Sequence, residues 1–132
     1  MDDATLYADC TRCIGLCCVL LAFDRGPMFA FDKPAGEPCV HLKPDESCAI
    51  HHRLEPEGCA GCARYDCLGA GQAVTAMFAG RSWRDGAATV REMYDAFVRV
   101  RERNRMRLAS LRAAGGMDAG DQRARPRSIT GA

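Results

Sequence analysis

Residues 10–18 read CTRCIGLCC and place four thiols within nine residues, two of them adjacent. The chain of 132 residues contains nine cysteines, and none of them lies beyond position 67. A small cysteine-rich region is usually held together by disulfides or by metal ions, because it lacks an ordinary hydrophobic core. The cysteines are Cys10, Cys13, Cys17, Cys18, Cys39, Cys48, Cys59, Cys62 and Cys67.

The start of the chain favours a reducing compartment. Its first ten residues, MDDATLYADC, lack the basic and apolar segments of a secretory signal. The longest apolar run, CCVLLAF, is much shorter than the roughly 18 residues of a membrane helix. We therefore expect a cytoplasmic protein with no membrane contact, in which thiols stay reduced. Nine cysteines also do not form a closed set of disulfides, so the clustered thiols predict metal binding.

The spacing of the thiols is typical of thiolate metal sites. Cys10 and Cys13 form one C-x2-C unit, and Cys59 and Cys62 form another. Two such units can complete a tetrahedral four-thiolate site, and iron–sulfur clusters use similar spacings. The adjacent Cys17 and Cys18 point in different directions in most backbones, so they can serve two sites, or one of them does not bind the metal. A set of buried apolar cysteines is the alternative, which their number and spacing disfavour.

The chain pattern predicts a small α+β fold. Residues 19–33, VLLAFDRGPMFAFDK, contain two apolar-aromatic runs around a turn at 24–27, which predicts a short β-hairpin. Residues 34–62 are rich in proline and glycine, so we expect loops with at most one helical turn near 49–54. A metal would have to stabilise this stretch, because it cannot build a core alone.

Helix formers replace the thiols after residue 67. Residues 68–80 predict a short helix that Gly80 ends, and Ser82 with Asp85 three residues later predicts a helix start. A long helix is expected over 84–113, packed through Val90, Tyr94, Phe97, Val98, Leu108 and Leu111. The predicted organisation is a cysteine-rich metal-binding region at 1–67, a helical region of the same domain at 68–114, and a disordered tail at 115–132.

Several motifs carry a resemblance to a known family. CTRCIGLCC is followed by PCVHL (38–42), CAIHHRL (48–54) and CARYDC (62–67), and this order resembles the YkgJ-like cysteine-cluster family of zinc- or iron-chelating proteins. More narrowly, FAFDKPAGEPC (29–39) and YDCLGAGQ (65–72) are similar to the N-terminal region of actinobacterial pentapeptide-repeat proteins. No pentapeptide repeat follows in this chain.

The resemblance implies a ligand set and a cofactor. Cys59 falls where such relatives often have another residue, which disfavours the Cys59/Cys62 pairing, and His51 stands where Tyr is common. Eight thiolates exceed the four that one zinc ion or one 4Fe–4S cluster needs, so one or two centres fit. We favour iron–sulfur clusters over Zn²⁺. The implied metal ligands are Cys10, Cys13, Cys17, Cys18, Cys39, Cys48, Cys62 and Cys67.

The family leaves the function open. The expected role is redox chemistry, sensing or electron transfer; some family members are flagellin lysine methylases suggested to hold an iron–sulfur cluster. Enzymatic activity stays open here, because the sequence names no catalytic residue. His41 and His51 follow Cys39 and Cys48 closely enough to reach the same ion. The alternative is that both are loop histidines that are exposed or hydrogen-bonded and bind no metal.

An arginine-rich segment supports the alternative function. Seven arginines fall in residues 91–112, against three acidic residues. A structural zinc module could use such a helix to bind nucleic acid or a protein. Because no aromatic residue interleaves the arginines of VRVRERNRMR (98–107), we expect a solvated helix face, or one bound to an acidic protein partner, rather than nucleic-acid binding. The oligomeric state stays open.

Overall fold

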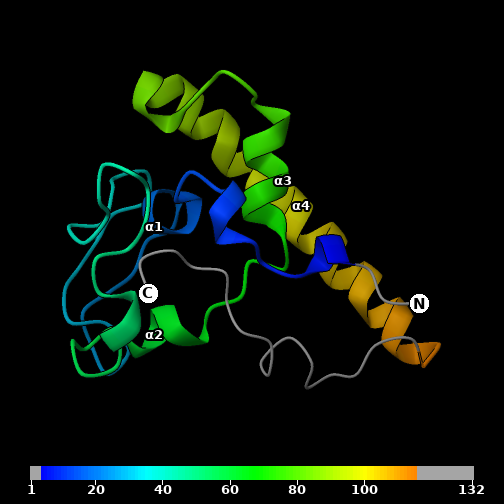
Figure 1. Ribbon diagram of the computed structural model, residues 1–132, viewed down its shortest axis with the longest axis horizontal. Helices are drawn as coiled ribbons and strands as arrows, with labels where there is room; N and C mark the ends of the chain where they lie inside the picture. Colours follow the sequence, from blue (N-terminus) through cyan, green and yellow to red (C-terminus); the bar gives the residue numbers. More distant parts are fainter. Residues whose placement is uncertain (1–3, 116–132) are drawn as a thin grey trace.

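The computed structural model describes residues 4–115, and the regular structure of this part of the chain is helical (Figure 1). Short 3-10 turns are interspersed among the α-helices. The 3-10 turns are η1 (Ala4–Leu6), η2 (Cys10–Arg12), η3 (His51–Arg53) and η4 (Trp83–Asp85). The α-helices are α1 (Leu16–Leu20), α2 (Ala60–Arg64), α3 (Ala70–Met77) and α4 (Ala87–Ala113).

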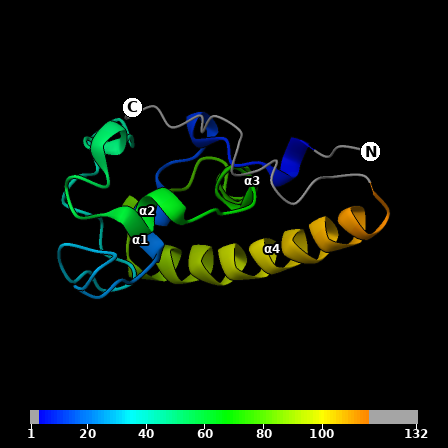
Figure 2. The same ribbon diagram turned by 90° about the horizontal axis from the view of Figure 1, so that it is seen from below.

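Helix α4 forms one long edge of the molecule, and α3 packs alongside it (Figures 1 and 2). The loops that carry most of the cysteines gather towards the N-terminal end of α4 (Figure 2). The buried positions of α4 recur at steps of three and four, as expected for a helix that buries one face. They are Thr89, Met93, Ala96, Phe97, Val100, Asn104 and Leu108.

The predicted long helix is confirmed, but its buried face was only partly identified. Phe97 and Leu108 are buried as predicted, whereas Tyr94 and Val98 are 39% and 47% exposed. The buried stripe instead includes the polar Asn104, whose side-chain amide donates a hydrogen bond of 2.8 Å to the Leu68 carbonyl. A side-chain amide whose hydrogen bond is made can therefore occupy a core position, and the spacing of apolar residues does not identify such a position.

The start of the helical region agrees with the sequence. Ser82 and Asp85 form a reciprocal capping box. This capping box starts the 3-10 turn η4, and α4 begins only after Gly86, three residues later than predicted.

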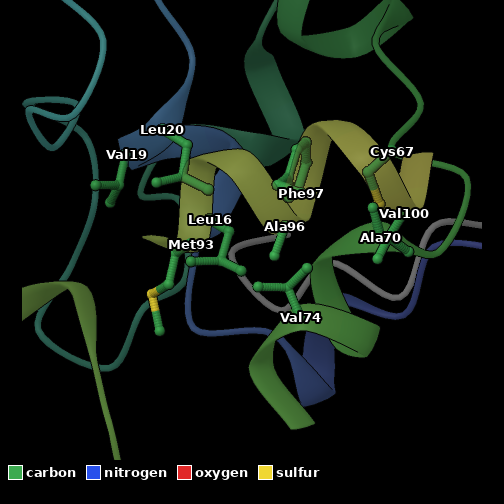
Figure 3. Packing of buried hydrophobic residues seen from close by; sticks show 10 residues of the cluster. All are labelled: Leu16, Val19, Leu20, Cys67, Ala70, Val74, Met93, Ala96, Phe97 and Val100. Carbon is green, nitrogen blue, oxygen red and sulfur yellow. The ribbon is translucent and has the colours of Figure 1, made fainter. Parts of the chain in front are cut away.

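One hydrophobic core joins the cysteine-rich half to the helical half (Figure 3). Helix α1 contributes side chains that pack against α3 and α4, and Phe97 is 1% exposed at their junction. The ten buried members are Leu16, Val19, Leu20, Cys67, Ala70, Val74, Met93, Ala96, Phe97 and Val100.

The predicted α+β class is wrong, because residues 4–115 contain no β-strand. The expected hairpin at 19–33 is reduced to one antiparallel bridge between Phe23 and Lys33, and a second isolated bridge joins Leu42 to Cys48. Proline at 27 cannot donate to a strand ladder, and the aromatic rings of this segment pack on one another instead. Phe23 stacks on Phe29 with ring centroids 4.2 Å apart.

The proline- and glycine-rich loops were expected and are observed. The turn η3 lies within the predicted 49–54, whereas the short helix α2 was not expected. The predicted tail, 115–132, lies outside the described residues except for Gly115.

Candidate metal centre

Eight of the nine cysteines line a single cavity of about 470 Å³. Apolar and aromatic side chains, including Leu21, Phe23, Phe29, Ile50 and Tyr65, make up much of the remaining wall. A set of soft sulfur donors in an apolar cavity suits zinc, copper(I) or an iron–sulfur cluster and does not suit calcium or magnesium. The cysteines of the wall are Cys10, Cys13, Cys17, Cys18, Cys39, Cys48, Cys59 and Cys62.

The first group of thiols comes from η2, α1 and the turn between them. Asp9 starts η2 by accepting a hydrogen bond from the Thr11 N–H. Gly15 then turns the chain with φ of 80°, where a Cβ would lie 2.9 Å from the Leu42 side chain. This turn brings the Leu16 N–H to 3.4 Å from the Cys13 sulfur, so the helix start donates a hydrogen bond to a thiol.

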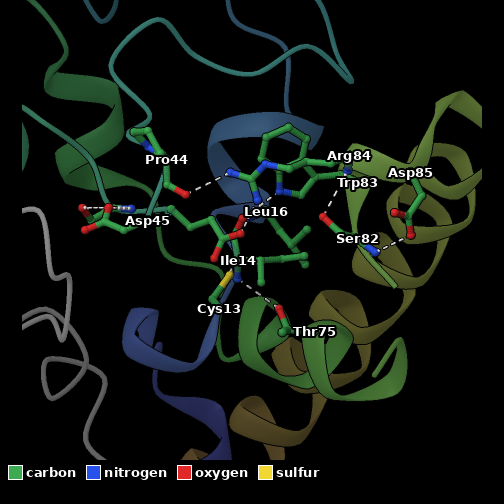
Figure 4. A network of polar contacts seen from close by, with 12 residues as sticks. Cys13, Ile14, Leu16, Pro44, Asp45, Thr75, Ser82, Trp83, Arg84 and Asp85 are labelled. Carbon is green, nitrogen blue, oxygen red and sulfur yellow. Dashed lines mark hydrogen bonds and ion pairs between the residues drawn. The ribbon is translucent and has the colours of Figure 1, made fainter. Parts of the chain in front are cut away.

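The helical half of the chain holds this group in place (Figure 4). The Ile14 N–H donates to the Thr75 hydroxyl of α3 at 3.3 Å, and the Trp83 indole N–H donates to the Ile14 carbonyl at 2.8 Å. Arg84 bonds the Pro44 carbonyl at 3.3 Å and pairs with Glu46. The loops that carry the thiols are thus attached to the helices by named polar contacts.

Cys39 and Cys48 lie in loops whose backbone N–H groups donate hydrogen bonds to a neighbouring carbonyl and to the cysteine sulfurs. The Cys39 N–H donates to the Cys18 carbonyl at 2.9 Å, which places these two ligand candidates next to each other. The His41 N–H donates to the Cys39 sulfur at 3.4 Å, and the Ile50 N–H bonds the Cys48 thiol in the same i+2 geometry. Backbone N–H bonds to sulfur stabilise thiolates and tune the clusters that they hold.

Cys59 and Cys62 flank the start of α2. Cys59 is 2% exposed and packs with Ile50 and Leu54 in a small hydrophobic cluster against which Cys62 also lies. A Cβ at Gly61 would lie 2.4 Å from the Phe29 ring, so the glycine lets this aromatic wall approach the two thiols.

Cys67 is outside the cavity wall but lies beside Cys13. A Cβ at Gly71, in the first turn of α3, would lie 2.8 Å from the Cys13 sulfur and 3.7 Å from the Cys67 sulfur. The Gly69 and Gly71 N–H groups bond the Cys67 thiol. The start of α3 therefore forms a cradle for two sulfurs that any side chain at position 71 would fill.

Five thiols of the cluster have a raised pKa, so they resist ionisation without a cation. Burial raises the pKa of Cys13 to about 11 and the pKa of Cys62 to about 12. Burial likewise raises the pKa of Cys39, Cys48 and Cys67, and bonds from backbone N–H groups lower each of them in part. A bound cation supplies the charge that thiolate ligands need in such surroundings.

Cys17 lies in α1, beside Cys18, on the wall of the cavity. Its hydrogen bond with Cys18, together with burial, raises the pKa of Cys18 well above its ordinary value. An ionised Cys17 would also raise the pKa of thiols from every cysteine-bearing segment. The affected thiols are Cys13, Cys18, Cys39, Cys48, Cys62 and Cys67.

Seven of the eight predicted ligands share the cavity wall, and Cys67 adjoins it through Cys13. Cys59, which the resemblance set apart, lines the same cavity. Among residues 4–115, no three His, Cys, Asp or Glu side chains are arranged so that they could hold a metal ion as they stand. No disulfide joins any of the nine cysteines, all of which lie within this described range.

Two of the three histidines reach the cavity. His41 and His51 line it, and the ring of His41 packs edge-on against Phe31 with centroids 5.8 Å apart. His52 is exposed and lies 3.1 Å from the Arg53 guanidinium, away from the thiols. His41 and His51 therefore remain ligand candidates, and His52 does not.

Lys33 is a site residue that the sequence reading missed. Its side chain is buried, 5% exposed, and its ammonium lies 5.6 Å from the centroid of Phe23, a cavity-wall residue. Burial lowers the pKa of Lys33, and the neighbouring Cys39 and Cys18 raise it. A lysine inside the apolar segment FAFDKPAG was the available signal, because lysine is rarely buried without a partner.

No helix within residues 4–115 has both the length and the apolar character needed to cross a membrane.

Comparison with known proteins gives one informative relative. The chain is 41% identical over 102 residues to the uncharacterized protein YybG of Bacillus subtilis (strain 168). The match covers 76% of this chain and 37% of the relative, so the chain spans little more than a third of the relative's length. No protein-family model matches the chain, and no solved structure matches it.

Proposed function

We propose that this protein is a metal-binding cysteine-cluster protein whose cavity holds one or two thiolate-bound metal centres, with iron–sulfur clusters favoured over zinc. The observation that carries the proposal is the convergence of eight cysteines from four separate stretches of chain on one cavity. Cysteines that were only small apolar residues would have no reason to share a wall, since apolar packing does not distinguish them from Ala or Val.

The size of the cavity favours a polynuclear centre. A structural zinc site needs four ligands that converge on one point, with Zn–S distances of about 2.3 Å. Here eight thiols surround about 470 Å³, and no three side chains of the described residues converge for a single ion. A cluster that spreads its ligands over several metal atoms fits such spacing better, and thiolates are the usual ligands of iron–sulfur clusters.

The chemistry that an iron–sulfur centre supplies is one-electron transfer or a response to oxidants, and the proposed role is redox chemistry, sensing or electron transfer. The chain's own contribution is to hold the thiols, to donate N–H bonds to Cys13, Cys39, Cys48 and Cys67, and to limit water through its aromatic wall. The N–H bonds to sulfur and the limited access of water both tune the reduction potential of a bound cluster. The resemblance to the YkgJ-like family, which rests on the cysteine order, is consistent with this proposal.

The alternative, a zinc module with a nucleic-acid-binding helix, has weaker support. The arginines of α4 are partly occupied within the chain: Arg101 donates to the Asp66 carbonyl at 2.9 Å, and Arg105 pairs with Glu102. The helix face is therefore of mixed charge rather than a continuous basic stripe, which favours a protein partner over nucleic acid.

Replacing one thiol of the cavity wall tests the proposal. We expect Cys17→Ser to weaken metal retention at least about tenfold, because a thiolate ligand of the wall is lost. Met106→Ser is the control, because it removes a sulfur from the exposed face of α4, outside the cavity wall, and it should retain the metal. Metal content after purification and after chelator competition gives the readout. Equal retention in the wild type and Cys17→Ser would contradict the assignment of the cavity as a metal site.

A further inference from the structure

The Lys33 side chain carries a full positive charge inside the protein. Its Nζ donates to three carbonyl oxygens, those of Val19 at 3.0 Å, Pro34 at 3.0 Å and Glu37 at 2.6 Å. A neutral amine has only two N–H donors, so three carbonyl acceptors require the ammonium form. The residue is 5% exposed, and water therefore does little to solvate this charge.

The ammonium has no carboxylate partner among the described residues. No ion pair to Lys33 is present in residues 4–115, and Glu37 reaches it through its backbone carbonyl while the residue itself is exposed. Buried charges are normally paired, since an uncompensated charge in an apolar interior is costly. The anion that compensates Lys33 must therefore come from another kind of group.

Thiols of the cavity are the neighbours that can supply this anion. Lys33 is bonded to the Val19 carbonyl at the end of α1, one residue after Cys18, and to the turn at 34–37 that leads into Cys39. The Cys39 N–H in turn donates to the Cys18 carbonyl, so the segments that carry these two cysteines are bonded to each other as well as to Lys33.

We propose that Lys33 is the internal counter-ion of an anionic metal–thiolate centre, and that it acts as a positioning residue which also holds Cys18 and Cys39 together. The inference rests on the proposed function, because the anion is the thiolate-bound metal. Four thiolates bring four negative charges, which exceed the charge of a divalent ion, so the centre keeps a net negative charge for a buried cation to neutralise.

Four variants separate charge from hydrogen bonding. Lys33→Arg keeps the charge and the donors, Lys33→Gln keeps donors without the charge, and Lys33→Met removes both. Lys43→Met removes an exposed lysine from a neighbouring loop and serves as the control. The measurements are the rate of metal transfer to a chelator and, for an iron–sulfur centre, the reduction potential of the bound cluster.

We expect Lys33→Gln and Lys33→Met to lose metal about tenfold faster than the wild type and to show a lower reduction potential. Lys33→Arg and Lys43→Met should stay close to the wild type. A wild-type rate and potential in Lys33→Gln would overturn the proposal, because hydrogen bonds alone would then suffice. Wild-type protein that binds no metal would instead refute the proposed function, so the two failures are distinguishable. If Lys33→Met does not fold, Lys33→Gln and Lys33→Arg still decide the question.

Discussion

Removing the metal should unfold the cysteine-rich half of the chain. The stretch from Asp9 to Cys67 has no β-strand and no helix longer than five residues. Its backbone hydrogen bonds are confined to short turns and to isolated contacts between loops. Its cavity of about 470 Å³ would leave the thiols and aromatic side chains without support. Structural zinc contributes on the order of 10 kcal/mol to folding, and thiolate clusters are expected to act in the same sense. The loss should exceed any effect of a single substitution.

Circular dichroism and limited proteolysis measure this effect. After treatment with a strong chelator under reducing conditions, we expect rapid tryptic cleavage at the exposed Arg25, Arg53 and Arg64. Reconstitution with the metal should restore protection and provides the control. If the protein keeps its spectrum and its protection after complete metal removal, packing alone holds the loops.

Gly69→Ala should cause the largest stability loss of any single methyl addition in the described chain. Gly69 has φ of 85°, and a Cβ there would lie 1.9 Å from the Thr5 carbonyl oxygen. The left-handed backbone costs Ala about 1–2 kcal/mol, and relief of the clash should bring the total to about 3 kcal/mol or more. The backbone of η1 cannot move away easily, because Gln72 of α3 bonds the Tyr7 carbonyl at 2.7 Å.

Gly80→Ala is the matched control for this substitution. Gly80 also has positive φ, 80°, but nothing lies within 4 Å of its Cβ position. It should therefore lose only the backbone contribution, about 1–2 kcal/mol. Urea unfolding of both variants with metal bound gives the comparison. Equal midpoints for the two variants would show that the contact with Thr5 has no energetic importance.

The helices were predictable because their signals are local. The capping pair Ser82 and Asp85 and the three-to-four spacing of apolar residues act within a few positions of the chain. The buried face of α4 was less predictable, because Asn104 enters the core only through a partner 36 positions away, Leu68. Contacts over such distances do not leave a local pattern in the sequence.

At the predicted hairpin, a local signal was present but the predicted structure did not form. The runs around Phe23 and Phe29 resemble paired strands, yet only the bridge from Phe23 to Lys33 forms. The rings of Phe23 and Phe29 form part of the cavity wall. The buried ammonium of Lys33 bonds carbonyls of α1 and of the turn at 34–37, and no strand ladder extends from this bridge. A fold organised around a cavity of thiols overrides the β preference of an aromatic segment.

The candidate site was predictable as a set of thiols but not as an arrangement. The order of the cysteines predicted a cluster, and most of the predicted ligands do share one cavity. The sequence could not place Cys67 beside Cys13 at Gly71, nor Cys59 on the same wall as Cys62, because these contacts depend on how α2 and α3 dock. The role of Lys33 depends on three carbonyls that only the folded chain brings together.

The most direct test is to purify the protein without oxygen and to measure its visible spectrum with its iron, zinc and acid-labile sulfide content. The account predicts a brown protein that absorbs near roughly 400 nm, with iron and sulfide in similar amounts. A colourless protein with one or two zinc ions per chain would keep the metal site but replace the redox role with a structural one. A folded protein with no bound metal, in which all nine thiols react at once, would contradict the central claim.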